Sequence, residues 1–405
     1  MKRVGDAYVF SFNGVFPTEI EVSDVRRKND GWHSWLTVRS LEPRKHLMAG
    51  EHNLGSTQTR HSLAKLLEGR LPLSGLQDDL DWAQRLEYAC IQTVQSERVG
   101  LPFIKVGSRP QEERHEFWLL EPYLRVGHPS MLFGDSGTGK TSLAILIGGL
   151  IAAVKGPVGF LDWENDADET EDIIRELRTG QNLDIPDFFY RRESHPLHAI
   201  VGQVKRLIDQ EGIVLAIIDS VGYALGGSPE DSADTLRFYS AVRQLGTTVL
   251  LIDHVKKTPD GRPIGSNYKR AEARILYEVT AHQEPDEPSL HMALRHEKAN
   301  RGALRKTHGL RIDYGDGWRR FAHEQITVPE LVKGLPHKEQ ISQYLRGASG
   351  LCTAEEIAEG TGIKLGTLKA RLSELSREGK VYVSNATGYA RRYSLLSDRM
   401  EEGVE

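Results

Sequence analysis

A glycine-rich segment, M-L-F-G-D-S-G-T-G-K-T over residues 131–141, carries residue types that suit the binding of a phosphate group. It follows a short apolar strand and precedes an apolar stretch, 142–153, that we expect to be helical. This order fits the Walker A pattern, in which glycines let backbone N–H groups turn toward phosphates and the helix N-terminus adds positive charge. We therefore expect a nucleoside triphosphate here. The expected binding residues are Gly134, Asp135, Ser136, Gly137, Thr138, Gly139, Lys140, Thr141 and Ser142.

A magnesium ion is expected beside the same loop. Lys140 would reach the β- and γ-phosphates, and the hydroxyl of Thr141 would ligate Mg²⁺. The apolar stretch I-V-L-A-I-I-D-S, 213–220, predicts a strand that ends in Asp219 at the carboxyl edge of a sheet. Asp219 would then hold Mg²⁺, directly or through water, as a Walker B aspartate does; the alternative is a strand that only contributes to the core. The expected cofactors are ATP and Mg²⁺.

An acidic segment follows the strand after the phosphate-loop helix, with the sequence G-F-L-D-W-E-N-D over 159–166. A carboxylate at the end of that strand could activate a water molecule aimed at the γ-phosphate. We choose Glu164 as this general base, with Asp162 as a second carboxylate. The alternative interpretation is an acidic loop that is merely solvated.

The elements that must position these residues alternate between strands and helices, which favours a parallel α/β sheet. The expected strands are 131–133, 158–162, 187–190, 214–219 and 248–253, and the expected helices are 142–153, 168–179, 197–210 and 232–245. Three later segments, 274–281, 289–295 and 310–314, are expected to add antiparallel strands. Before this block, 8–12, 19–22 and 35–38 indicate strands with a hairpin turn at 29–31, and two helices follow, the second capped by Asp81.

Length and composition limit the class of protein. The chain has 405 residues, 39% hydrophobic and 27% charged, with a net charge of −5, so any nucleic-acid binding must be local. Its two cysteines exclude a disulfide framework, and neither a signal-peptide pattern nor an apolar run of membrane-spanning length is present, so we expect a cytoplasmic protein. The expected division is 1–100 as an α+β domain of unreadable role, 101–124 as a connector, 125–324 as the nucleotide-binding domain, 325–335 as a linker, 336–396 as a C-terminal domain and 397–405 as a tail.

The stretches G-D-S-G-T-G-K-T, F-L-D-W-E-N-D, I-I-D-S, L-L-I-D-H-V-K-K, R-P-I-G-S and H-E-K-A-N-R-G resemble, in this order, the RecA-like hexameric ATPases, and within them the plasmid RepA-type and DnaB-type helicases. The resemblance covers about 115–320 and implies a RecA-like P-loop core. It implies that Glu164 is the base and that His254 senses the γ-phosphate. It also implies that Lys298 and Arg301 reach the nucleotide of a neighbouring subunit, although both could instead belong to a solvated basic turn. Gly265–Ser266 resembles a loop that faces the central channel in this family.

The C-terminal segment is similar to a winged helix–turn–helix, with three expected helices, 337–346, 353–360 and 365–377, and a strand pair. Leu368, Leu372 and Leu375 give the third helix an apolar face, and Thr353 with Glu356 forms a capping box at the second. From 336 to 395 the sequence has nine Lys and Arg against six Asp and Glu. The candidate nucleic-acid contacts are Lys364, Thr367, Lys369, Arg371, Arg391 and Arg392. The alternative is a module that docks onto protein.

These features lead to one main hypothesis and two alternatives. The main hypothesis is an ATP-hydrolysing, DNA-dependent motor that forms a homo-oligomeric, hexameric ring. It would work as a RepA-type replicative helicase or translocase of a plasmid, phage or integrated element does. Its expected partner is single-stranded or origin DNA, and no membrane is expected to take part. The first alternative is a RecA- or KaiC-like DNA-binding ATPase without unwinding activity. The second is a nucleotide-switched DNA-binding regulator that acts through its winged helix.

Overall fold

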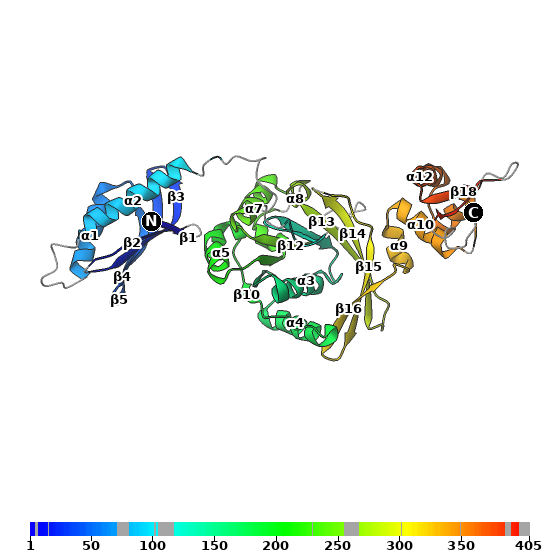
Figure 1. Ribbon diagram of the computed structural model, residues 1–405, viewed down its shortest axis with the longest axis horizontal. Helices are drawn as coiled ribbons and strands as arrows, with labels where there is room; N and C mark the ends of the chain where they lie inside the picture. Colours follow the sequence, from blue (N-terminus) through cyan, green and yellow to red (C-terminus); the bar gives the residue numbers. More distant parts are fainter. Residues whose placement is uncertain are drawn as a thin grey trace.

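The computed structural model describes residues 1–4, 7–14, 16–70, 81–100, 103, 117–228, 230–254, 267–300, 302–348, 350–384 and 390–396. Its elements form three groups along the longest axis of the molecule: an N-terminal group drawn in blue, a large central group drawn in green and yellow, and a C-terminal group drawn in orange and red (Figure 1).

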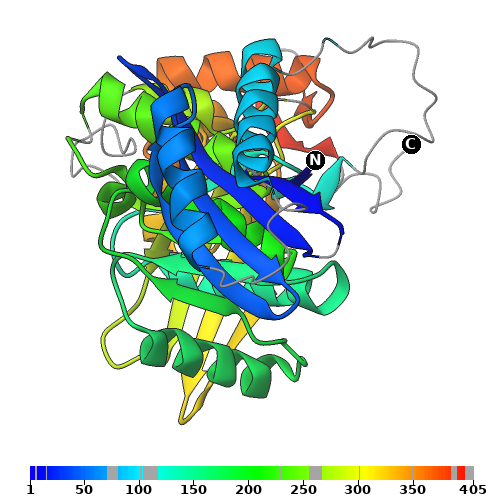
Figure 2. The same ribbon diagram turned by 90° about the vertical axis from the view of Figure 1, so that its left-hand side faces the viewer.

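The N-terminal group is an antiparallel sheet of five strands in chain order, with two helices on one face (Figure 2). Its elements are β1 (Lys2–Val4), β2 (Ala7–Phe12), β3 (Thr18–Lys28), β4 (Gly31–Leu41), β5 (Arg44–Asn53), α1 (Thr57–Arg70) and α2 (Trp82–Val99). Two expectations are confirmed, because Lys28 pairs with Gly31 across the hairpin turn and the Asp81 carboxylate accepts a hydrogen bond from the Gln84 amide at the start of α2. Alternate residues of the strands, such as Val22 and Leu36, pack against the helices.

The central group contains a sheet of nine strands in the order β10-β9-β11-β12-β8-β13-β14-β15-β16. The first six are parallel: β10 (Phe189–Arg192), β9 (Val158–Asp162), β11 (Leu215–Asp219), β12 (Thr248–His254), β8 (Pro129–Gly134) and β13 (Ile275–His282). Three antiparallel strands extend it: β14 (Ser289–Ala299), β15 (His308–Gly315) and β16 (Trp318–Glu324). The five expected parallel strands are confirmed, and 289–295 and 310–314 lie in antiparallel strands as expected. The segment 274–281 was expected to be antiparallel, but it forms β13, which pairs parallel with β8 and antiparallel only with β14, because it is inserted beside the central strand β8. Strand β16 was not expected, because it lies at the sheet edge and none of its residues is fully buried, so it lacks the apolar alternation of a strand.

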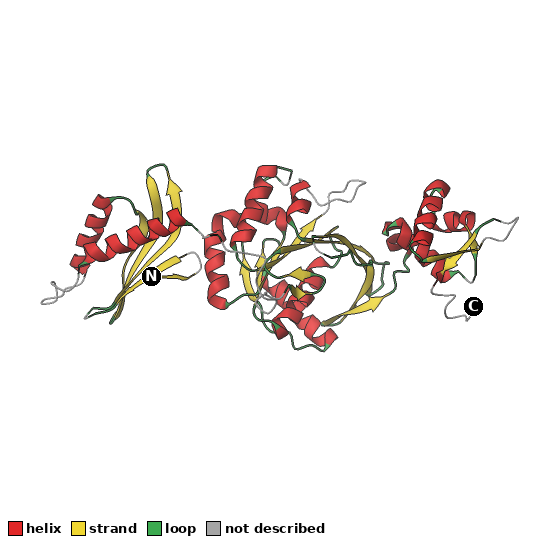
Figure 3. Ribbon diagram, turned by 45° about the horizontal axis from the view of Figure 1, so that its top comes forward, coloured by secondary structure: helices red, strands yellow, loops and turns green. Residues whose placement is uncertain are grey.

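Helices cover both faces of this sheet (Figure 3). One face carries α3 (Lys140–Val154) and α4 (Ala167–Gln181), and the other carries α5 (Leu197–Glu211), α6 (Val221–Leu225) and α7 (Ser232–Gln244), with α8 (Asn267–Glu272) beside α7. Strand residues alternate between the two cores: Leu250 and Ile252 pack on the α3 side, whereas Val249 and Leu251 pack on the α7 side. The sheet is therefore buried on both faces, as parallel sheets require.

Two segments predicted as connections contain packed structure. The segment 101–124 includes β6 (Trp118–Leu120), which pairs with β7 (Leu124–Arg125). The segment 325–335 includes α9 (Pro329–Gly334), where Leu331 and Leu335 are buried together with Ala293 and Ile326. These apolar contacts pack α9 against β13 and β14 of the central sheet, so it does not act as a free linker.

The C-terminal group consists of three helices and a three-stranded antiparallel sheet in the order β17-β19-β18. Its elements are α10 (His337–Gly347), β17 (Cys352–Thr353), α11 (Ala354–Thr361), α12 (Leu365–Arg377), β18 (Val381–Ser384) and β19 (Arg392–Leu395). The capping box at Thr353 is confirmed, and so is the buried apolar face of Leu368, Leu372 and Leu375. The expected wing turn at 385–388 and the tail lie outside the described residues.

Candidate nucleotide-binding and hydrolytic site

The phosphate loop connects the carboxyl end of β8 to the first residue of α3 and depends on two glycines. A Cβ atom on Gly134 would lie 2.1 Å from the carbonyl oxygen of Val279 in the adjacent strand β13. Gly139, which caps α3, has a φ of 77°, in the left-handed region that favours glycine. The loop can thus approach the sheet closely and aim its amides at the start of the helix, where an anion is stabilised.

Lys140 is a buried cation inside this loop. Its side chain is 5% exposed, and Nζ donates to the carbonyl oxygens of Gly134 at 3.0 Å and Asp135 at 2.5 Å and to the hydroxyl of Thr138 at 3.3 Å. Burial lowers the pKa of Lys140, against the opposing effect of nearby carboxylates, of which Asp219 is the strongest. A phosphate group in the loop would supply the negative charge that this ammonium lacks.

Thr141 and Asp219, the two residues expected to bind a metal ion, contact each other. The Thr141 hydroxyl donates to Oδ2 of Asp219 at 2.7 Å, and Asp219 is 1% exposed at the end of β11. Burial raises the pKa of Asp219 to about 7, with the carboxylates of Glu164 and Asp162 acting in the same direction and the Thr141 hydrogen bond opposing it. Two hard oxygen ligands fit Mg²⁺, which takes few protein ligands and completes its shell with phosphates and water. Among the described residues no group of three or more His, Cys, Asp or Glu side chains could hold a metal ion.

Glu164 lies between two hydrogen-bond donors at the same edge of the sheet. Its Oε1 atom accepts from the Ser220 hydroxyl at 2.5 Å and contacts Nε2 of His254 at 3.1 Å. The three residues follow or end β9, β11 and β12, which are adjacent parallel strands, so their carboxyl ends meet. The hydrogen bond from His254 is the main reason that the pKa of Glu164 is lowered, and the same contact raises the pKa of His254. Glu164 is therefore held as a carboxylate within a site that also contains Lys140.

Asp162 was expected to be a second carboxylate beside Glu164, but both of its carboxylate oxygens accept hydrogen bonds from neighbouring groups of the protein. Its Oδ1 atom accepts hydrogen bonds from the backbone amides of Glu164 and Asn165, both at 2.9 Å, and Oδ2 accepts one from the Tyr190 hydroxyl at 3.3 Å. The side chain thus shapes the turn that presents Glu164, and its oxygens are occupied by the protein.

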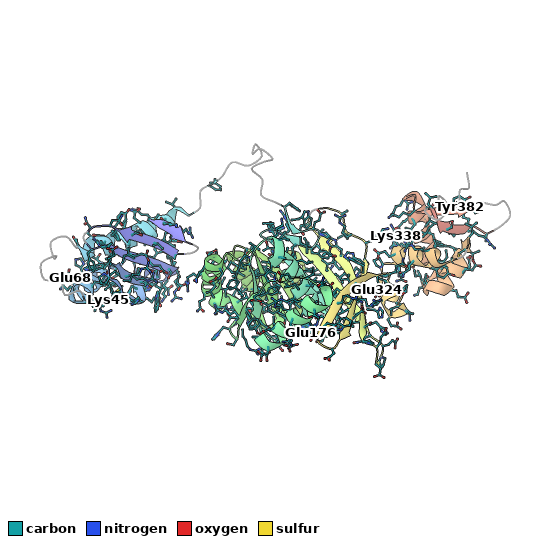
Figure 4. All side chains as sticks on the ribbon, turned by 60° about the horizontal axis from the view of Figure 1, so that its bottom comes forward. Lys45, Glu68, Glu176, Glu324, Lys338 and Tyr382 are labelled. Carbon is teal, nitrogen blue, oxygen red and sulfur yellow. The ribbon has the colours of Figure 1, made fainter. Side chains whose placement is uncertain are left out.

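Two contacts at the site were missed by the sequence interpretation. Ser220 follows Asp219 directly, and the quoted stretch I-I-D-S contained it without indicating its contact with Glu164. Arg319 of β16 donates to the Ser142 hydroxyl at 2.5 Å and to Glu176 of α4 at 2.7 Å (Figure 4 labels Glu176). No local pattern could reveal Arg319, because it lies 177 positions from Ser142 in the sequence.

Lys298 lies away from this cluster. It pairs with Leu276 of β13, which lies beside Met131 near the start of β8, whereas the phosphate loop follows the end of β8. Its Nζ atom donates to the carbonyl oxygens of Arg270 at 2.6 Å, Ala271 at 2.8 Å and Ala273 at 2.7 Å, so all three N–H bonds of the ammonium are used within the chain. The trans role expected for Lys298 would require these bonds to break. Arg301 lies outside the described residues.

The candidate nucleic-acid residues belong to the C-terminal group. Lys364 precedes α12 and lines, with Thr367, a hollow of about 500 Å³ between that helix and α10. On the surface of α12, Lys369 forms an ion pair with Glu355 at 3.1 Å, and Arg371 forms one with Glu374 at 2.7 Å. Arg392 begins β19, directly after Arg391. Exposed pairs of this kind are weak and exchange readily for other anions.

Comparisons with known proteins support the nucleotide chemistry. Residues 95–260 match a family model described as an AAA domain. No curated protein matches this chain with significance. Among solved structures, a KaiC-like protein from the archaeon Pyrococcus horikoshii is similar over 49% of this chain and 93% of its own, with 15% identity and a TM-score of 0.37. In the part of the chain that the structure describes, no helix combines the length and apolar character that a membrane crossing needs. The family match and the phosphate-loop geometry together support nucleotide binding and hydrolysis by a P-loop in the central part of this chain.

Proposed function

We propose that this protein is an ATP-hydrolysing motor of the RecA-like kind that works on DNA as a ring, as a RepA-type replicative helicase or translocase does. The observation that carries the proposal is the contact of the Glu164 carboxylate with His254, beside Lys140 and the Thr141–Asp219 pair. The proposed units are 1–100, a P-loop domain at 125–324 and a winged helix at 336–396.

Binding of the nucleotide would use the loop amides and Lys140. Lys140 would exchange its contacts with the loop carbonyls for the β- and γ-phosphates. Mg²⁺, held by Thr141 and Asp219, would supply charge compensation for the phosphate oxygens.

Glu164 would act as the general base. Its lowered pKa keeps it ionised at neutral pH, so it can orient a water molecule and accept its proton. His254 touches the same carboxylate oxygen and lies opposite Gly134 in the register of β12 and β8, between the base and the loop. Loss of the γ-phosphate on hydrolysis would therefore alter the surroundings of His254 and Glu164 together.

The ring is proposed because Arg319, the second permanent cation that the structure places beside the loop with Lys140, is bound to Ser142 and Glu176. Charge on the transferring phosphoryl group calls for a further cation. We assign that role to Arg301 of a neighbouring copy, since the donors of Lys298 are occupied. The basic C-terminal segment would bring the ring to DNA.

The decisive experiment measures ATP turnover of the full chain with and without single-stranded DNA, and displacement of a strand from a forked duplex. Glu164→Gln is expected to lower kcat by about 100-fold or more while nucleotide still binds. Glu171→Gln, an exposed carboxylate on α4, is the matched control and should behave as wild type. Unchanged turnover in Glu164→Gln would remove the assignment of the base.

Two other outcomes decide between the proposed motor and its alternatives. Turnover that DNA stimulates without strand displacement would favour a DNA-binding ATPase that does not unwind. Negligible turnover together with ATP-dependent binding of a duplex site would favour a regulator. Mass measurement with a non-hydrolysable ATP analogue tests the ring, and a strict monomer would contradict the role of Arg301 in trans.

A further inference from the structure

A buried ion pair lies directly behind the His254–Glu164 contact. Nζ of Lys269 in α8 is 2.9 Å from Oδ2 of Asp253 in β12, and the two side chains are 1% and 2% exposed. Asp253 immediately precedes His254. Because side chains alternate along a strand, Asp253 lies on the face covered by α7 and α8, and His254 lies on the face of α3. The ion pair thus holds the end of β12 on one face of the sheet, and His254 projects from the same strand end on the opposite face.

Helix α8 is itself held from several directions although it has only six residues. Arg270 contacts Glu297 of β14 at 2.9 Å, and the hydroxyl of Tyr239 in α7 donates to the carbonyl oxygen of Lys269 at 3.2 Å. Lys298 of β14 binds three carbonyl oxygens at the carboxyl end of the helix. A cation suits this end of a helix, where carbonyl groups lack intrahelical partners. These contacts place Lys269 firmly beneath β12.

Stability alone gives little reason for charges at this place. A buried ion pair is seldom more stable than a well-packed apolar pair of the same volume, because both charges must leave water. What the pair adds is a directional contact. A directional hydrogen bond can fix the orientation of the strand end that carries His254. The contact between His254 and Glu164 needs such a fixed orientation, because a displacement of catalytic groups by about 1 Å can lower the rate by about 100-fold.

We propose that Lys269 is a positioning residue for hydrolysis. Its ion pair with Asp253 holds the carboxyl end of β12 so that His254 stays hydrogen-bonded to Glu164, and Lys298 supports it in cis by fixing α8. The inference rests on the proposed function, because it takes Glu164 to be the base. It also gives Lys298 a role inside its own subunit.

The first test separates nucleotide binding from turnover in the full chain. Lys269→Met is expected to lower kcat by about 10-fold or more while the Kd for an Mg²⁺-bound fluorescent ATP analogue changes by less than about 3-fold, since the phosphate loop is untouched. Lys269→Arg, which keeps the charge, should recover part of kcat. Arg243→Ala breaks an exposed contact between α7 and Glu272 of α8 and serves as the matched control, with kcat within about 2-fold of wild type.

A second variant keeps the test decisive if the unpaired Asp253 prevents folding. The double variant Asp253→Leu/Lys269→Leu leaves no unpaired charge at this position and should fold, with a low kcat and a near-normal Kd. Wild-type kcat in this double variant would overturn the proposal, and so would a parallel loss of affinity and turnover with a lowered Tm. If wild type itself shows no turnover, the proposed function fails; if wild type is active and both Lys269 variants are as active, only this inference fails.

Mixing of subunits tests the cis role of Lys298. Lys298→Ala is expected to lower turnover, and mixing it with the Lys140→Ala variant should recover none of the lost activity, because each chain carries its own defect. A residue acting in trans would behave differently: intact loops of the Lys298→Ala chains would receive Lys298 from the Lys140→Ala chains, and turnover would reappear. Recovered turnover, or a fully active Lys298→Ala, would overturn the cis role.

Discussion

Nε2 of His254 lies 3.1 Å from Oε1 of Glu164, although the two residues are 90 positions apart in the sequence. The contact forms because β9 and β12 lie on either side of β11 and end at the same edge of the sheet. Each residue shifts the pKa of the other, lowering that of Glu164 and raising that of His254. The proposed base and His254, which lies opposite Gly134 in the register of β12 and β8, therefore form one electrostatic unit.

This coupling predicts a change in the pH profile of turnover when His254 is replaced. In wild type the hydrogen bond lowers the pKa of Glu164, so kcat should fall only when the pH drops below the ordinary carboxylate range near 4.5. His254→Leu removes the bond and leaves burial, which raises the pKa of Glu164. The acid limb of the kcat profile should then move to higher pH.

His254→Gln provides the control for this prediction, because a glutamine amide can still donate to the carboxylate. Its acid limb should lie between those of wild type and His254→Leu. Equal profiles for all three proteins would show that Glu164 does not govern the acid limb.

Asp219 is expected to limit the stability of the nucleotide-free protein at alkaline pH. Its folded pKa of about 7 lies above the ordinary value of 3.8, so the folded state binds the proton more tightly. The stabilising contribution is complete below pH 4 and is lost as the pH rises through about 7. Asp219→Asn should therefore raise the free energy of unfolding at pH 8 by roughly 2–4 kcal/mol and change it little at pH 4.

Denaturant unfolding at the two pH values measures this difference. The same substitution should abolish the Mg²⁺ dependence of nucleotide binding, since it removes the proposed charged ligand. A variant that is less stable than wild type at pH 8 would contradict the assigned origin of the pKa shift.

Gly134 is predicted to be intolerant of even a methyl group. A Cβ atom there would meet the carbonyl oxygen of Val279 at 2.1 Å, so β8 and β13 would have to separate. Gly134→Ala should cost roughly 1–3 kcal/mol or more and lower nucleotide affinity. Gly334→Ala, with nothing within 4 Å at the end of α9, is the control and should be neutral or stabilising by up to about 1 kcal/mol. Thermal unfolding with and without ATP compares the two.

Lys369 and its partner Glu355 are predicted to change DNA binding in opposite directions. Lys369→Ala should weaken binding of a labelled duplex and reduce the slope of log K against log salt by about 1, because one phosphate contact is lost. Glu355→Gln frees the Lys369 ammonium and should strengthen binding modestly. Lys45→Ala, in the N-terminal group at the other end of the molecule (Figure 4), is the control. Equal losses for Lys45→Ala and Lys369→Ala in an anisotropy titration would exclude α12 as the DNA contact.

Much of the local structure follows from residues that are close in the sequence. The phosphate loop, the Asp81 cap, the hairpin turn before Gly31 and the capping box at Thr353 each depend on a few consecutive residues. The buried strands were recognisable for a similar reason, because a fully buried strand is a continuous apolar run such as that ending in Asp219. Strands at sheet edges, β5 and β16, lack this signal since they keep many polar residues.

The arrangement of the site was decided by the tertiary structure. Glu164 and Asp219 were recognisable at strand ends, and His254 was indicated by the family resemblance. Only the strand order, however, brings Ser220 to Glu164 and Asp162 into a turn-shaping role. Arg319 reaches Ser142 only because β16 closes the sheet against α4, and Lys298 binds α8 rather than remaining free. Such contacts depend on which strands pair and on how the whole chain buries its apolar surface. A sequence pattern identifies the residues at one strand end, whereas the packing of the complete sheet determines which other strand ends lie beside it.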